Sequence, residues 1–237
     1  MLMPIQSWVK AHRKFTLGAA LIAVLVAGVL ISLPILRAME TRQIALAATS
    51  ATQLMEDAMA SPAIFTAKPD DEAQRLAVTA DQLARLHDGL VLARIHFAKG
   101  AWRAAVEYTE FTQRYVLKLS DVSKSLQTSR DVTARYDDAV NTFKLTNAKD
   151  RVEAANSLNA ALIEARHQTE ITFQDCVLVM TLTRQVRTTF DAAHLALNEV
   201  GPDPAAATSA LMPRIQAALE AAQAIRKQFN PMAKSDF

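Results

Sequence analysis

Glu164 and His167 are three residues apart, a spacing that places a carboxylate and an imidazole on one face of a helix. Ferritin-like di-iron sites take this Glu-x-x-His motif from each of two helices, together with two further glutamates. This chain has no second copy of the motif. Its nearest equivalent, Asp191 with His194, would lie about 40 Å further along the same helix. We therefore favour a solvated, charged helix face over a metal site, and a helical-bundle metalloprotein stays as an alternative.

Other catalytic or cofactor-binding patterns are missing from the sequence. His87 and His96 are nine residues apart and cannot form a ligand pair on one helix face, and the single cysteine, Cys176, excludes an internal disulfide framework. There is no phosphate-binding loop, nucleophile elbow, His-Glu-x-x-His motif or haem-attachment motif. The net charge of +2 argues against a dedicated nucleic-acid binder. We expect no enzymatic activity, no cofactor and no small-molecule substrate.

The scarcity of turn residues predicts an all-α fold. Between residues 70 and 200 there is no proline, and the only glycines are Gly89 and Gly100. A β domain of this size would need many more turn residues. We therefore expect one helical domain after the first 36 residues, with helices over 37–60, 70–98, 101–146, 150–200 and 204–230.

Two of these helices carry an unusually long apolar seam. Residues 101–146 and 150–200 repeat apolar or threonine side chains in steps of three and four, which is typical of coiled-coil packing. Only residues 147–149 separate them, so we predict a long antiparallel hairpin over 101–200. Asp150 with Glu153 indicates a capping box at the start of the second helix, and Gly201-Pro202 marks its end.

Residues 96–105 resemble the inner turn of a tetratricopeptide repeat, with Gly100, Trp102 and Ala105 at consensus positions. That resemblance implies a pair of antiparallel helices joined by a tight turn. No second copy follows at a 34-residue period, and a single repeat is not stable alone. We favour a simple hairpin turn at Lys99-Gly100 between the helices over 70–98 and 101–146.

Residues 15–36 form an uncharged apolar run of about 33 Å as a helix, enough to cross a bilayer. The apolar part of a secretory leader is usually shorter and ends in a small-x-small cleavage site, whereas Arg37-Ala38-Met39-Glu40 follows here. We predict a retained transmembrane helix, with a cleaved leader as the alternative. Small residues at four-residue spacing would allow close helix packing in lipid, and they are Ala19, Ala23, Ala27 and the adjacent Gly28.

Basic residues flanking this run set its expected orientation. Three precede it and two follow it, which favours a cytoplasmic N-terminal segment, 1–14, and a periplasmic domain, 37–237. The Ala-rich, Lys-poor composition is associated with bacterial proteins, so we predict a bacterial inner membrane. The expected interface anchors are Trp8, Lys10, Arg13 and Lys14 on one side and Trp102, near the turn at Gly100, on the other.

The unequal helix lengths predict that the far half of the hairpin, from Val122 to Thr172, projects beyond the rest of the bundle. Two helices alone can cover only one apolar seam, and exposed apolar surface usually marks a protein interface. The candidate partner-binding residues are Tyr136, Val140, Phe143, Leu158, Leu162 and Ile171.

Together these features predict a single-pass structural or scaffolding subunit of a larger envelope complex, which binds other protein subunits or a second copy of itself. The alternative is a periplasmic sensor. Chemoreceptor input domains resemble this chain in architecture, since they also place an antiparallel helical bundle next to a membrane helix. A second membrane helix is not predicted after residue 36, so a sensor would need a separate signalling partner.

Overall fold

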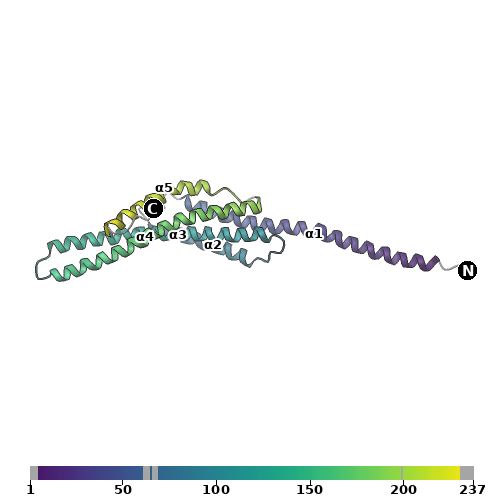
Figure 1. Cartoon of the computed structure of the whole chain (residues 1–237), viewed down its shortest axis with the longest axis horizontal. Helices are drawn as coiled ribbons and strands as arrows, with labels where there is room; N and C mark the ends of the chain where they lie inside the picture. The colour runs from purple at the N-terminus through teal and green to yellow at the C-terminus, as the bar shows by residue number, and fades with distance from the viewer. Residues whose placement is uncertain (1–4, 61–64, 66–68, 199, 230–237) are drawn as a thin grey trace.

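The computed structural model describes residues 5–60, 65, 69–198 and 200–229, and for residues 5–31 it describes the helical backbone alone. The described residues form five helices: α1 Ile5–Met59, α2 Pro69–Leu92, α3 Lys99–Leu145, α4 Arg151–Leu197 and α5 Ala205–Phe229. They pack as an elongated bundle in which α3 and α4, each 47 residues long, lie side by side (Figure 1). The prediction of an all-α bundle with a long hairpin is confirmed.

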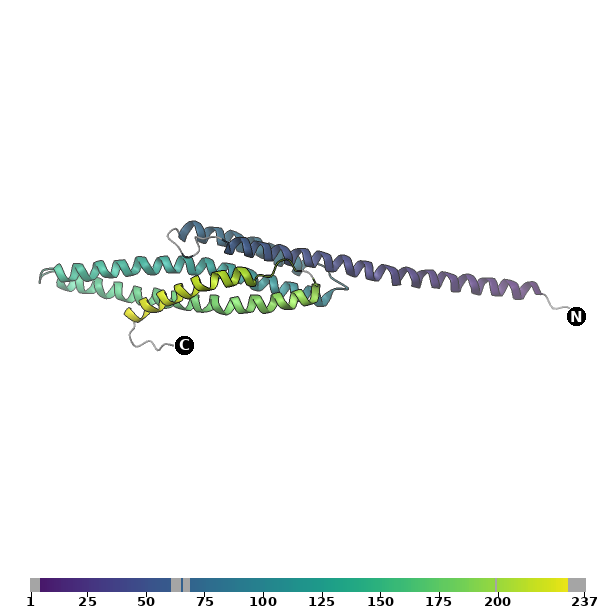
Figure 2. The ribbon, with the colours of Figure 1, turned by 90° about the horizontal axis from the view of Figure 1, so that it is seen from above.

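Helix α1 is continuous over 55 residues, about 80 Å. Its second half packs in the bundle, and its first half extends away from the bundle as a single rod (Figure 2). Within the described part of the chain, no helix is long and apolar enough to cross a bilayer. Most of the predicted span, 15–36, lies outside the residues whose side chains are described, so the transmembrane helix stays a prediction.

Helices α3 and α4 form the predicted antiparallel hairpin, joined by residues 146–150. The predicted capping box at its second helix is wrong. Asp150 precedes α4, but its φ of −102° and ψ of 6° are not the extended backbone that a capping side chain uses, and it makes no capping hydrogen bond. Helix α4 ends at Leu197, earlier than predicted, because Asn198 adopts the left-handed conformation and donates its N–H to the His194 carbonyl.

The connection between α2 and α3 differs from the prediction. We expected the helix to continue to residue 98 and to turn at Lys99-Gly100. Instead α2 ends at Leu92, residues 93–98 form the connection, and Gly100 lies in the first turn of α3. The reason is tertiary, since the carboxylate of Glu40 on α1 accepts the backbone N–H groups of this connection.

Helix α5 passes through Pro213 without ending and packs along α4. Its last residue, Phe229, is buried together with Val132 of α3 and Ala165 of α4. The predicted projection of the whole region from Val122 to Thr172 is therefore too long. Val122 itself is buried, and the hairpin projects only beyond the point where α5 ends.

The main core lies where α1, α2 and α5 surround the lower part of the hairpin. Tyr108 and Tyr115 of α3 are among its largest fully buried side chains. The Tyr108 hydroxyl lies 2.8 Å from the Thr52 hydroxyl of α1, so the helix that leads to the N-terminus is hydrogen-bonded into the core. Burial raises the pKa of the Tyr108 hydroxyl to about 12, and it stays neutral at any physiological pH.

Candidate functional site

The hairpin tip, which we define as residues 133–164, contains no buried residue between Val132 and Ala165. It is the far end of α3 and α4, and most of it lies beyond the end of α5 (Figure 1). Leu145 is 85% exposed and Val152 is 73% exposed, and Ile163 is exposed as well. Large apolar side chains that are exposed on a two-helix projection are candidates for a protein contact.

The predicted partner-binding residues occupy two different environments. Tyr136 and Leu162 pack against the second, smaller core cluster, where the Tyr136 ring lies edge-on to Phe229 at 5.0 Å. Val140, Phe143 and Leu158 are half-buried, and Ile171 is exposed on α4 below the tip. The sequence pattern followed the seam and therefore missed the most exposed apolar residues of the tip, which lie off it: Leu145, Val152 and Ile163.

Polar contacts fix the hairpin just below its tip. The hydroxyls of Ser129 and Thr172 lie 2.9 Å apart in a buried position, and Thr172 also donates to the Ser125 carbonyl. Asp175 accepts from the Ser125 hydroxyl and pairs with Lys118 at 3.2 Å. Because buried hydrogen bonds are directional, these contacts define the register in which α3 and α4 pair, and so define which side chains the tip presents.

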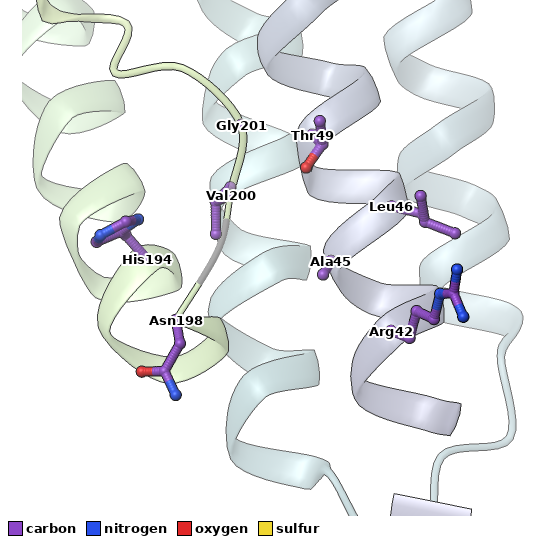
Figure 3. A pocket seen from close by; sticks show the side chains of 8 residues that line it. All are labelled: Arg42, Ala45, Leu46, Thr49, His194, Asn198, Val200 and Gly201. Atoms are coloured by element: carbon purple, nitrogen blue, oxygen red, sulfur yellow. The ribbon is translucent and has the colours of Figure 1, made fainter. Parts of the chain in front are cut away.

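A cleft of about 500 Å³ opens between α1 and the end of α4. Arg42 and Thr49 come from α1, while His194 comes from the last turn of α4 and Gly201 from the connection to α5 (Figure 3). Gly201 has a φ of 61° and a Cβ there would lie 3.0 Å from the Thr49 side chain, so glycine is required for the connection to pass this closely. The full lining is Arg42, Ala45, Leu46, Thr49, His194, Asn198, Val200 and Gly201.

The charge of this cleft suits a small anionic group. Arg42 supplies a permanent positive charge, and the His194 ring stacks on Phe190 at 5.9 Å. A neighbouring hollow shares Arg42 and Ala45 and adds Arg37, so two guanidinium groups lie along this stretch of α1. This cleft could not be predicted from the sequence, because its residues come from three segments that only the tertiary fold brings together.

Glu40 forms the most concentrated polar contact at this end of the bundle. Its two carboxylate oxygens accept the backbone N–H groups of His96, Phe97 and Ala98 at 2.8–3.0 Å. These hydrogen bonds, led by that from His96, hold the pKa of the Glu40 carboxyl below its ordinary value. Glu40 thereby joins α1 to the connection between α2 and α3.

The candidate metal ligands Glu164 and His167 are not brought together with other ligand side chains in the described part of the chain. Glu164 pairs with Arg135 at 2.8 Å on the surface, and His167 is exposed. Across the described part of the chain, no group of three or more His, Cys, Asp or Glu residues is arranged to hold a metal ion. Cys176 is buried, and desolvation followed by the nearby charge of Asp175 raises the pKa of its thiol to about 12.

Among the predicted membrane anchors, only Trp102 has a side chain that the structure describes. Trp8, Lys10, Arg13 and Lys14 lie outside the residues whose side chains are described, as do the small residues Ala19, Ala23, Ala27 and Gly28. Trp102 is half-buried, and its indole N–H donates to the Leu90 carbonyl at 2.6 Å. It lies in the first turn of α3, at the end of the bundle from which α1 leaves (Figure 2).

Comparison of the chain with protein-family models, with curated proteins and with solved structures finds no match.

Proposed function

We propose that this chain is a non-enzymatic, single-pass membrane protein and a structural or scaffolding subunit of a larger envelope complex. In this proposal residues 15–36 span a bacterial inner membrane, and residues 37–237 form a periplasmic bundle. The hairpin tip binds another protein subunit or a second copy of the chain.

The observation that carries the proposal is the exposure of apolar side chains on the hairpin tip. Residues 133–164 contribute no buried side chain to either core cluster, and they expose Leu145, Val152 and Ile163 to solvent. Leaving a leucine or isoleucine side chain exposed forgoes about 1.5–3 kcal/mol of burial free energy. A bundle that functioned alone would gain nothing from presenting these side chains on a projection, whereas a partner surface would bury them.

The course of α1 supports the anchoring half of the proposal. The helix runs without a break from Ile5 to Met59, so the apolar run and the bundle belong to one rod. A rigid connection would hold the bundle at a fixed height and orientation relative to a bilayer, which is what a scaffolding subunit requires.

Photo-crosslinking in intact cells tests the proposal directly. A photoreactive amino acid in place of Leu145 or Val152 should give discrete crosslinked adducts. The matched control replaces Val78 on α2, which is also an exposed valine but lies away from the tip, and it should give none. Size analysis of the purified chain in mild detergent then distinguishes a second copy from a different subunit. The proposal is wrong if the tip positions give no more adducts than position 78 and the purified chain is monomeric.

The cleft beside Arg42 favours a second candidate function, a periplasmic ligand-binding bundle that works with a separate signalling partner. Its volume of about 500 Å³ and its cationic lining suit a small anionic ligand. A ligand that binds the folded state raises the melting temperature by mass action. Small carboxylates and phosphates should then raise the melting temperature of the wild-type chain and not of Arg42→Ala. No shift with any of them would eliminate this candidate.

A further inference from the structure

The base of the bundle, which we define as residues 91–103 with the last turn of α4, faces the direction in which α1 leaves the bundle (Figure 2). We propose that this base rests on the surface of an anionic bilayer, with Leu92 and Phe97 among the lipid headgroups and Arg94, Lys99 and Arg103 over lipid phosphates. This inference rests on the proposed function, because only a membrane span at residues 15–36 brings a bilayer to this end of the molecule.

The position of the base relative to the apolar run is set by Glu40. The run ends at Leu36, and Glu40 is one turn further along α1, or about 6 Å. Its carboxylate holds the backbone of His96, Phe97 and Ala98, so the connection between α2 and α3 lies at the same height. A bilayer that ends at Leu36 therefore has its headgroup layer at the level of this connection.

The base exposes large apolar side chains. Leu92 is 80% exposed and Phe97 is 41% exposed, and Val91 is exposed beside them. Leu195, in the last turn of α4, is 83% exposed. These residues belong to three different segments that end or begin at this one end of the bundle, where apolar side chains beside basic ones fit the boundary between water and hydrocarbon.

The charge of the base complements anionic lipid. Residues 91–103 contain Arg94, Lys99 and Arg103, all exposed, and no acidic residue. Glu40 is the carboxylate that contacts this segment, and its oxygens are engaged by three backbone N–H donors. Basic residues that are held near a membrane are attracted by the negative surface potential of anionic lipids.

Trp102 stays a predicted membrane anchor, and the structure shows a contact that it makes within the base. Its indole N–H is directed at the Leu90 carbonyl, near the end of α2, and the ring packs against the core. It therefore fixes the shape of the base, and the large apolar side chains that are exposed there include Leu92 and Phe97.

The test uses the full chain reconstituted into vesicles of phosphatidylcholine with about one-third phosphatidylglycerol. Three cysteine variants are each labelled with a fluorophore that responds to polarity: Leu92→Cys, Phe97→Cys and, as the control, Leu145→Cys. The native Cys176 is buried and should not label, which the wild-type chain checks. Nitroxide lipids should quench the fluorophore at positions 92 and 97 several-fold more than at position 145.

Charge reversal tests the electrostatic part of the inference. A triple variant should show reduced quenching at positions 92 and 97 in the same vesicles. It combines Arg94→Glu, Lys99→Glu and Arg103→Glu. Reversal of three exposed basic residues of the hairpin tip should leave the quenching unchanged, and these are Lys144, Lys149 and Arg151.

Flotation of the same samples distinguishes failure of the membrane anchor from failure of the proposed contact between the base and lipid. If the chain does not float with the vesicles after a high-pH wash, the membrane span is absent and both proposals are overturned. If the chain floats but positions 92 and 97 are no more quenched than position 145, the anchor stands and the docking of the base on lipid is overturned.

Discussion

A single carboxylate organises the base of the bundle. Glu40 accepts three backbone N–H groups from residues that follow it by 56–58 positions. Backbone N–H groups in a connection between helices have no helical partner, so a side chain or water must pair with them. Glu40 satisfies them, and its charge strengthens each hydrogen bond.

The contribution of Glu40 to stability should depend on pH. The folded-state pKa of its carboxyl is lowered, so its stabilisation is present above the ordinary glutamate pKa and is lost as the pH falls through the folded-state value. Glu40→Gln should lower the midpoint of thermal unfolding at neutral pH. At an acidic pH where the carboxyl is protonated in both states, wild type and variant should differ far less.

Circular dichroism of the full chain in detergent at the two pH values measures this difference. Glu107→Gln is the matched control, since Glu107 is an exposed glutamate of α3, and it should change the midpoint little at either pH. A deficit of Glu40→Gln that is equal at both pH values would contradict the assignment of the effect to the charged carboxylate.

At the scale of the element, α5 determines how much of the hairpin is free. Three contacts hold its last turn against α4. The Arg166 guanidinium donates to the Phe229 carbonyl at 2.7 Å, and the Arg226 guanidinium pairs with Glu170 at 2.6 Å and lies 4.4 Å from the centre of the Phe173 ring. Because the end of α5 is fixed in this way, Tyr136 and Leu162 pack against the bundle, and the part of the hairpin tip between them is free of α5.

Truncation of Phe229 should release this end of α5. Phe229 is 2% exposed and packs against Tyr136, so Phe229→Ala should cost about 3 kcal/mol of unfolding free energy, the lower end of the range for buried phenylalanine. Leu145→Ala, at an exposed position of the tip, should change it by less than about 0.5 kcal/mol. Urea titration followed by circular dichroism measures both. Equal effects of the two substitutions would contradict the second core cluster.

The helices themselves were predictable, because their signals are local. Apolar spacing and the scarcity of glycine and proline over residues 70–200 predict the long hairpin and its antiparallel pairing. The end of α2 was not predictable in the same way. Residues 93–98 contain no helix breaker, and the helix ends there because Glu40, which is distant in sequence, binds the backbone.

The candidate sites were predictable only in part, for a related reason. The pattern indicated that the hairpin would project, but how far it projects depends on where α5 ends against it, and periodicity does not encode that register. Leu145 and Val152 were missed because they lie off the seam that the pattern follows. The cleft beside Arg42 needs residues of α1, α4 and the 200–201 connection, which no local motif links.

At the scale of the whole molecule, the described part of the chain is an elongated bundle whose main core lies away from the hairpin tip. Helices α3 and α4 are each 47 residues long, about 70 Å, and they carry the tip far from the base. The α3 residues of the main core cluster all precede residue 132, and its α4 residues all follow residue 165. The tip and the core should therefore be separable, and the tip can be removed without unfolding the bundle.

Shortening of the hairpin tests this separation. Replacement of residues 142–157 by a short glycine-containing loop should leave the helix content per residue and the midpoint of thermal unfolding nearly unchanged, because no residue in that range is buried. Leu119→Ala, which truncates a fully buried leucine of α3, is the contrasting control and should cost about 2–5 kcal/mol. If the shortened chain unfolds as readily as Leu119→Ala, the tip stabilises the bundle, and its exposed leucine and valine side chains no longer argue for a partner.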